Sequence, residues 1–268
     1  GLALAVVAAC VALAGVARAV DAPAPSVAVP SQIRVGVTPN YPPLIFKQDG
    51  QLRGLEADFA RQLGEDTGAK IVFVELPWDE QIPALEKGLI DVVMSGVSIT
   101  EERLARVAFV TPYAEVGQMA LIRNADLGRF SEPQSMSEAG RRIGVVRNTT
   151  GAAYARGNLK QAEIVEFDSA DAGIAALRGG KIDFFIHDAP TIWRTVGRPG
   201  EPDAELIGLY RPLTQESLAW AIRKADQATL GALLDAELAR WKQSGKLKSL
   251  ITYWVPVRRV TQTGGGEG

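Results

Sequence analysis

Cysteine and histidine are nearly absent from the sequence, which has one of each among 268 residues. A protein-bound zinc ion takes three or four ligands, commonly from these two residue types, so the composition predicts no metal site. A single cysteine also excludes a disulfide bond within the chain. Neither charge is in large excess: 29 basic and 31 acidic residues give a formal net charge of −2, which argues against nucleic acid as a partner.

Patterns typical of common enzyme classes are missing as well. No glycine-rich phosphate-binding loop is present, and no Ser-His-Asp or paired-carboxylate arrangement stands out. We therefore expect no cofactor and no catalytic residues. What is present is an ordinary globular composition, 47% hydrophobic and 22% charged, at a length that suits one large domain or two small ones.

The first residues have the pattern of an export signal. Residues 2–17 are apolar, too short a run to span a membrane comfortably, and they end in Ala17-Arg18-Ala19, with small residues where a signal peptidase cleaves. We expect residues 1–19 to be an N-terminally incomplete signal peptide, and the protein to be periplasmic. The segment ending in Cys10 also fits a lipoprotein box, and an uncleaved anchor is a third interpretation. Residues 20–32 then form a tether and residues 259–268 a flexible tail.

Strands and helices alternate through the rest of the chain. Residues 33–37, 71–76 and 92–94 have the β-branched, apolar pattern of strands, and residues 55–66 and 79–87 have that of helices. This alternation predicts an α/β fold, with a mostly parallel sheet flanked by helices. Ligands of such folds bind beyond the carboxyl ends of the strands, so functional residues are expected just after each strand.

The chain repeats one pattern twice. Residues 84–95 and 176–187 both run from a helix end through glycine and one aspartate into a short apolar strand, which opens into a polar residue: Ser95 in one half and His187 in the other. The strands 33–37 and 143–146 also correspond. Two matches in the same order predict two α/β lobes of one design facing each other. One large α/β domain is the alternative.

Several motifs resemble those of periplasmic polar-amino-acid-binding proteins of ATP-driven (ABC) importers, family 3 of the bacterial solute-binding proteins, which includes glutamine-, histidine- and lysine/arginine/ornithine-binding members. The specific motif is Gly96-Val97-Ser98-Ile99-Thr100-Glu101-Glu102-Arg103, followed by Phe109 and Pro112-Tyr113. Weaker similarities extend over residues 33–254, at Tyr41-Pro42-Pro43, Gly54–Asp58, Thr149–Ala155 and His187–Pro190.

The resemblance implies a type II periplasmic-binding-protein fold, with two lobes that close on one amino acid. Lobe 1 would comprise residues 33–116 and 216–258, and lobe 2 residues 117–215, joined by two hinge segments near 113–119 and 215–219. The resemblance further implies that the protein is a monomer and delivers its amino acid to the membrane permease of an ABC importer.

A free amino acid presents a carboxylate and an ammonium, and each needs a partner once it leaves water. Arg103 offers a planar fork that matches a carboxylate, although position alone also fits a surface arginine. The resemblance assigns Arg103 to the carboxylate, together with Ser98 and the N–H of Thr150 at a helix start. Thr149 and Thr150 also fit a simple helix cap.

The resemblance assigns the ammonium to Asp188, helped by the Gly96 carbonyl and the Ser98 hydroxyl; by its position before Ala189-Pro190, Asp188 also fits a helix N-cap. It gives Tyr41 and Trp78 the role of aromatic walls around the aliphatic part of the ligand. His187 fits either side-chain recognition or a packed strand end. Ser95, after the first repeated strand, completes the predicted site.

Departures from the family pattern bear on which amino acid is bound. Thr38 stands where binders of basic amino acids commonly carry aspartate, and Asn148 stands where glycine is usual but is still tolerant of positive φ. Arg147 fits either a solvated side chain or a partner of an acidic ligand. We expect glutamine or another neutral polar amino acid first, glutamate or aspartate second, and basic amino acids last.

Two other functions remain open at this point. The same fold resembles exported cyclohexadienyl (arogenate) dehydratases, which need a general acid in the cleft. Those enzymes carry a glutamate where this chain has Thr191, whose hydroxyl is too weak an acid for the task. A ligand-sensing module is the other alternative.

Overall fold

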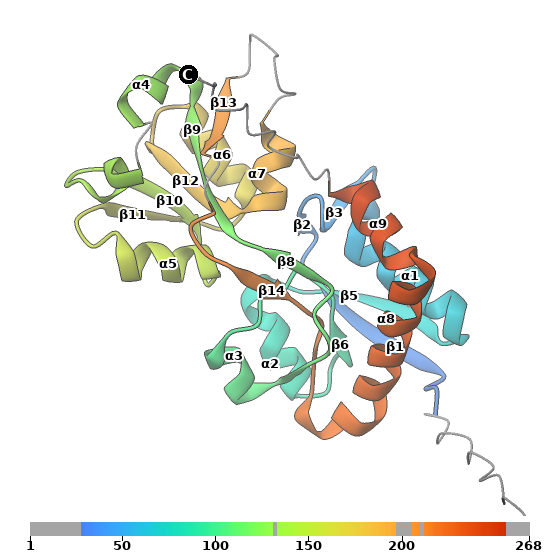
Figure 1. Ribbon diagram of the computed structural model, residues 1–268. Coiled ribbons are helices and arrows are strands. Elements are labelled where there is room, and N and C mark those ends of the chain that lie inside the picture. Colours follow the sequence, from blue (N-terminus) through green and yellow to red (C-terminus); the bar gives the residue numbers. More distant parts are fainter. Residues whose placement is uncertain (1–27, 131–132, 197–204, 210–211, 256–268) are drawn as a thin grey trace, which may run out of the picture.

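The computed structural model describes residues 28–130, 133–196, 205–209 and 212–255. The predicted signal peptide, residues 20–27 of the predicted tether and the predicted tail lie outside these residues. Two groups of strands and helices make up the described chain, and two long segments cross between them (Figure 1). The predicted α/β fold with two lobes is confirmed, because each group has its own five-stranded sheet.

The first sheet has the strand order β5-β1-β6-β15-β7. β1 runs parallel to both of its neighbours, whereas β15 runs antiparallel to β6 and β7. Its strands are β1 (Gln32–Val37), β5 (Lys70–Glu75), β6 (Val92–Val93), β7 (Ala108–Phe109) and β15 (Ala221–Ile222). The helices of this lobe are α1 (Leu55–Thr67), α2 (Gln81–Glu86), α3 (Glu101–Arg106), α8 (Ala232–Ser244) and α9 (Lys246–Trp254). A small antiparallel sheet joins β2 (Asn40–Tyr41), β3 (Ile45–Gln48) and β4 (Gln51–Arg53).

The second sheet has the order β11-β10-β12-β9-β13. β10 is parallel to β11 and β12, and β9 is antiparallel to β12 and β13. Its strands are β9 (Gln118–Arg123), β10 (Arg142–Val146), β11 (Glu163–Phe167), β12 (Phe184–Asp188) and β13 (Leu206–Leu209). Its helices are α4 (Leu127–Phe130), α5 (Thr150–Asn158), α6 (Ala170–Arg178) and α7 (Ala189–Thr195).

Burial on both faces of each sheet explains the apolar strands. In β1, Ile33, Val35 and Val37 are fully buried on the face covered by α1 and α8, whose Phe59 and Trp241 belong to the same core. A separate core fills the other face, and the second sheet likewise has two cores. The strands thus read as nearly continuous apolar runs, which is typical of sheets covered by helices on both sides.

The internal repeat predicted from the sequence has a physical basis in an ion pair. Arg34 at the start of β1 pairs with Asp91, with 2.6 Å between Nη2 and Oδ1, and Arg142 at the start of β10 pairs with Asp183 at 2.9 Å. In both lobes the aspartate also accepts the backbone N–H of its arginine. The repeated aspartate therefore fixes β6 beside β1 in one lobe and β12 beside β10 in the other.

The two crossing segments are β8 (Ala114–Val116) and β14 (Glu216–Leu218), which pair antiparallel in a sheet of their own. Figure 1 shows them side by side between the lobes. They lie where the sequence placed the hinge. Gly117, directly after β8, is required by close approach, because a Cβ there would lie 2.2 Å from the Thr214 carbonyl oxygen.

Lobe 1 also contains a fully buried carboxylate, Glu56, in the first turn of α1. It accepts hydrogen bonds from the Gly96 N–H at 2.8 Å, the Tyr113 hydroxyl at 2.6 Å and the Trp220 indole N–H at 2.8 Å. Among the residues that the structure describes, no cationic side chain forms an ion pair with it. Burial raises the pKa of Glu56 to about 7, against the opposing effect of these three donors.

This pKa predicts a specific dependence of stability on pH. Because the folded state holds the proton of Glu56 up to about pH 7 and the unfolded state only to about 4.5, the contribution of Glu56 to stability is lost as the pH rises between these values. Relative to Glu56→Gln, the free energy of unfolding of the wild type is expected to fall by up to about 3 kcal/mol over that window. Urea unfolding of both proteins from pH 5 to pH 8 measures this difference. A constant difference would contradict the prediction.

Candidate functional site

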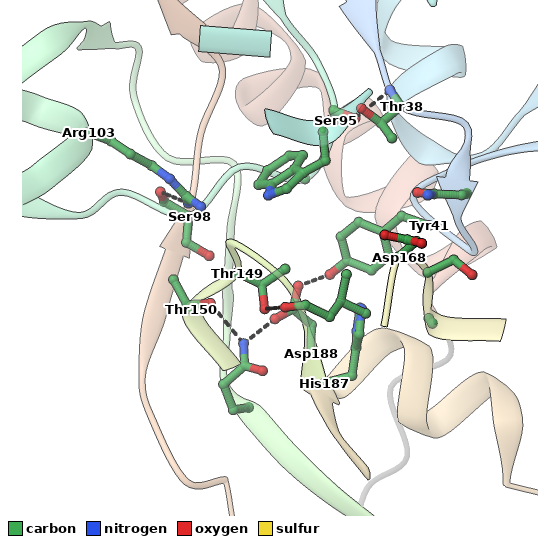
Figure 2. Close-up of a pocket in the computed structure, with 17 residues that line it drawn as sticks. Thr38, Tyr41, Ser95, Ser98, Arg103, Thr149, Thr150, Asp168, His187 and Asp188 are labelled. Carbon is green, nitrogen blue, oxygen red and sulfur yellow. Dashed lines mark hydrogen bonds between the residues drawn. The ribbon is translucent and has the colours of Figure 1, made fainter. Parts of the chain in front are cut away.

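A cavity lies between the two lobes and encloses about 580 Å³ of empty space, including the solvent at its mouth. All ten residues predicted from the sequence line it: Tyr41, Trp78, Ser95, Gly96, Ser98, Arg103, Thr149, Thr150, His187 and Asp188. Figure 2 shows the Ser98–Arg103 side of the cavity facing Asp188 and His187 across it.

Arg103 is positioned by a short helix and by its own loop. Thr100 caps α3 by accepting the N–H of Arg103, and Nη1 of Arg103 donates to the Ser98 carbonyl oxygen at 2.8 Å. The guanidinium group lies 5.3 Å from the ring centroid of Trp78, a favourable cation–π distance. Burial lowers the pKa of Arg103, and the nearby carboxylates of Asp188 and Glu216 oppose that effect. Arg103 is therefore a half-buried cation at the cavity wall.

The N-terminus of α5 lies at the same end of the cavity. The Thr149 hydroxyl accepts the Ala152 N–H at 3.3 Å and donates to the Val146 carbonyl oxygen, so Thr149 is the helix cap that the sequence also allowed. Thr150 accepts a hydrogen bond from Gln118 at 3.0 Å. A helix N-terminus beside an arginine favours an anionic group.

Asp188 lies at the opposite side, at the end of β12, and is 8% exposed. It occupies the N-cap position of α7, but its carboxylate makes no cap hydrogen bond. One oxygen accepts from the Tyr41 hydroxyl, which comes from lobe 1 (Figure 2). The other accepts from the Gln118 side chain. Burial raises the pKa of Asp188. The carboxylate thus faces the cavity and does not cap the helix.

The two serines of the predicted site, Ser95 and Ser98, each form a hydrogen bond within the protein. The Ser98 hydroxyl donates to Glu216 on β14 at 2.7 Å, and Ser95 accepts the Thr38 N–H at 2.9 Å. Gly96, between them, has a φ of +68°. A Cβ at Gly96 would lie 2.5 Å from the Tyr41 ring, so only glycine allows this aromatic side chain to approach the turn.

Aromatic groups enclose the middle of the cavity. The Tyr41 ring meets the His187 ring edge-on, with 5.1 Å between the centroids. The Trp78 indole N–H donates to the Asn148 carbonyl oxygen of lobe 2 at 2.8 Å, and Asn148 adopts the positive φ, 57°, that the sequence allowed. His187 is 9% exposed, and its Nδ1 is buried without a hydrogen-bond partner among the described residues. Burial lowers the pKa of His187, which favours the neutral ring.

Comparison with known proteins agrees with this geometry. Residues 33–257 match the bacterial extracellular solute-binding proteins, family 3, and the match includes all ten predicted site residues. The chain belongs to this family. The resemblance inferred from the Gly96–Arg103 motif is confirmed, and so is the type II periplasmic-binding-protein fold that it implied.

Individual relatives support the same assignment. The L-cystine-binding protein TcyJ of Escherichia coli K12 is 28% identical over 82% of this chain and 81% of its own. A binding component of an ABC transporter from Wolinella succinogenes, solved with lysine, superposes with a TM-score of 0.79 at 28% identity, covering 88% of this chain and all of that one. An ancestral amino acid-binding protein, described as a precursor of cyclohexadienyl dehydratase, superposes with a TM-score of 0.76 at 29% identity. The match covers 84% of this chain and 95% of that one.

Sequence reasoning missed several lining residues of this family 3 protein. Gln118, at the point where the crossing segment enters the second sheet, bonds to Thr150, Asp188 and Glu216. Its burial at 1% exposure could not be read from the sequence, although a polar residue beginning an apolar strand was a usable signal. Asp168, Ser169 and Ala170 directly follow β11. The expectation that functional residues follow strands should have included them.

Arg147, whose role the sequence left open, pairs with Asp168 at 2.9 Å. Both side chains are more than half exposed, so water screens this ion pair. Within the described ranges, no cluster of three or more potential metal ligands occurs, and no helix is long and apolar enough to cross a membrane.

Proposed function

We propose that the protein captures one free polar amino acid between its lobes. The observation that carries this proposal is a half-buried cation and a buried carboxylate, Arg103 from lobe 1 and Asp188 from lobe 2, lining one cavity between the lobes. The two charges suit the carboxylate and the ammonium that every free amino acid carries on one carbon. We further propose that lobe 1 comprises residues 33–116 and 216–258 and lobe 2 residues 117–215.

In this proposal Arg103, with the N-terminus of α5, holds the carboxylate of the amino acid, and Asp188 holds its ammonium. The ammonium replaces the Tyr41 hydroxyl or joins it at Asp188, because both are donors to the same buried carboxylate. Trp78 and Tyr41 contact the aliphatic part. Each desolvated charge then has a partner, which makes the energetic penalty of leaving water small.

The side chain of the amino acid would lie near Thr38, Asp168 and His187, and this part of the cavity suits a neutral polar group. We therefore rank glutamine first among the ligands, glutamate or aspartate second and basic amino acids last. Thr38 brings no charge, and its hydroxyl already donates to the Leu76 carbonyl oxygen and accepts from Gln81. Asp168 pairs with Arg147 and is mostly exposed to water, which screens its charge. The unpartnered Nδ1 of His187 supplies a polar contact for an amide or hydroxyl group. The relatives named above bind cystine and lysine, so ligand identity varies within the family.

Family membership supports an extracytoplasmic role, and we propose that the protein is periplasmic and delivers its amino acid, as a monomer, to the permease of an ABC importer. We do not assign a catalytic step. Thr191, which stands in the place of the dehydratase glutamate, donates to the Pro42 carbonyl oxygen at 3.1 Å and does not line the cavity. The solved relative described as a dehydratase precursor is itself an amino acid-binding protein.

A thermal-shift screen of the twenty amino acids and prephenate tests the proposed function. A ligand at a hundredfold excess over its dissociation constant stabilises the fold by about 2.7 kcal/mol, which is readily seen as a raised melting temperature. We expect the strongest stabilisation from a neutral polar amino acid. Stabilisation by none of the twenty, or turnover of prephenate, would overturn the proposal.

Closure of the two lobes on the amino acid is the second expected behaviour. Arg103 and Asp188 lie in different lobes, so one small molecule bound to both favours the closed arrangement. We expect the radius of gyration from small-angle scattering to decrease when the amino acid is added, and the fluorescence of Trp78 to change as its surroundings become drier. Binding with an identical scattering curve would indicate a rigid pocket in place of a clamp.

A further inference from the structure

A carboxylate that takes no part in the proposed ligand contacts links the cavity to the hinge. Glu56 accepts hydrogen bonds from three donors, and each comes from a different segment of lobe 1. Gly96 belongs to the binding turn, residues 95–98, of which Ser95, Gly96 and Ser98 line the cavity. Tyr113 directly precedes β8, and Trp220 follows β14 by two positions. One carboxylate therefore holds the lobe-1 ends of both crossing strands together with the binding turn.

The surroundings of Glu56 leave its donors no other charged acceptor. Gly96, Tyr113 and Trp220 are enclosed with it. Among the residues that the structure describes, the titratable groups that face this cluster are Tyr113 and Tyr41 and, through these two tyrosines, Asp188 of lobe 2 and Glu216 of β14. The ionised carboxylate satisfies all three donors with its two oxygens. A protonated carboxyl or an amide presents a hydrogen to one of them, so that a buried donor loses its acceptor.

We propose that Glu56 is a positioning residue: its ionised carboxylate fixes the binding turn relative to both crossing strands, and loss of its charge changes how the lobes are oriented. The proposal rests on the two-lobe clamp proposed above. Burial, which raises the pKa of Glu56 to about 7, brings this loss of charge within reach of ordinary buffers. The lobe orientation should therefore respond to pH without any amino acid present.

Spin labels on the two lobes measure this response directly. In the full chain with Cys10→Ser, labels are attached at Lys87→Cys in lobe 1 and Lys160→Cys in lobe 2, both exposed positions. Pulsed electron spin resonance then gives the interlobe distance from pH 5.5 to pH 8.5, without added amino acid. We expect the wild-type distribution to shift with a midpoint near pH 7. Glu56→Gln should lose this shift and keep the low-pH distribution throughout.

Two further variants and one spectrum separate positioning from simple stabilisation. Glu237→Gln removes another buried carboxylate of lobe 1, one that pairs with Arg240 away from the hinge, and should respond to pH as the wild type does. The indole ¹⁵N–H resonance of Trp220 should titrate with the same midpoint as the distance. Tyr113→Phe removes one donor and retains the carboxylate, so it should reduce the size of the pH-dependent change in interlobe distance. This variant serves as the test if Glu56→Gln does not fold.

The proposal is overturned if Glu56→Gln retains the wild-type response to pH. The response would then arise from another titratable group, such as His187 or Asp188. It is also overturned if neither the distance nor the Trp220 resonance of the wild type changes with pH. Because no amino acid is added, these outcomes are independent of the thermal-shift screen. Failure of the screen alone would leave the role of Glu56 standing and remove only the proposed ligand.

Discussion

Replacing Arg103 by alanine is expected to weaken the binding of every amino acid ligand to a similar extent, because the α-carboxylate is common to all of them. Removing one partner of a desolvated charge pair costs about 3–5 kcal/mol, a factor of about 150 or more in the dissociation constant. Isothermal titration calorimetry with two or three amino acids that stabilise the wild type measures the loss. Unchanged affinity would make Arg103 a surface residue and remove the carboxylate end of the proposed site.

Arg106→Ala provides the matched control for Arg103. Arg106 lies one turn further along the same short helix, is exposed, and pairs with Glu86 at 2.6 Å outside the ligand cavity. Its removal takes away the same charge from α3, so any effect of lobe 1 charge or of α3 stability appears in both variants. We expect the affinity of Arg106→Ala to remain within about twofold of the wild type, because exposed ion pairs contribute little.

The second large effect is expected for Asp188→Asn. Asparagine keeps the shape of the side chain and an oxygen that accepts from Tyr41 or Gln118, but it removes the counter-charge of the ammonium. The affinity is expected to fall by at least about 2 kcal/mol, roughly 30-fold. The stability of the unliganded protein should not fall, because burial already raises the pKa of Asp188 and thus penalises its charged form. At saturating amino acid, scattering should still detect closure.

A ligand without the ammonium makes this experiment specific. The desamino analogue of the best amino acid should bind the wild type weakly, and Asp188→Asn should not weaken it further, whereas Arg103→Ala should weaken both ligands. Asp171→Asn removes an exposed carboxylate from the same lobe and is expected to bind like the wild type. If Asp188→Asn weakens the analogue as much as the amino acid, Asp188 acts by holding Tyr41 and Gln118, and the ammonium lies elsewhere.

The fold was largely predictable because its signals are local. Strand β1, helix α1 and the repeated glycine–aspartate–strand unit depend on periodicity and on residues close in sequence, and Gly88 and Gly180 both have the positive φ expected at helix ends. The predicted helix from residue 79 differs in its start, since residues 78–80 form a 3₁₀ turn before α2. That turn is what places Trp78 at the cavity.

The hydrogen-bond network of the site was not predictable, because it joins residues that are far apart in sequence. Ser98 is predicted to accept from the ammonium of the amino acid, and nothing in the local sequence indicates that its hydroxyl also donates to Glu216. Gln118 connects Asp188 to Glu216 only because β9 lies next to β12 and begins beside β14. Such contacts follow from the register between strands, which local sequence does not specify.

The strand order of the first sheet also has a consequence for folding. β15 lies between β6 and β7, so β6 can pair with β1 early, but β7 joins the sheet only when residues 221–222 are available. The second sheet needs only the continuous stretch from β9 to β13. Pairing over long sequence separations is slow, since the intervening chain must be ordered first. We expect the second lobe to acquire protection from hydrogen exchange earlier during refolding, and the first lobe to remain incomplete until the chain has returned through β14.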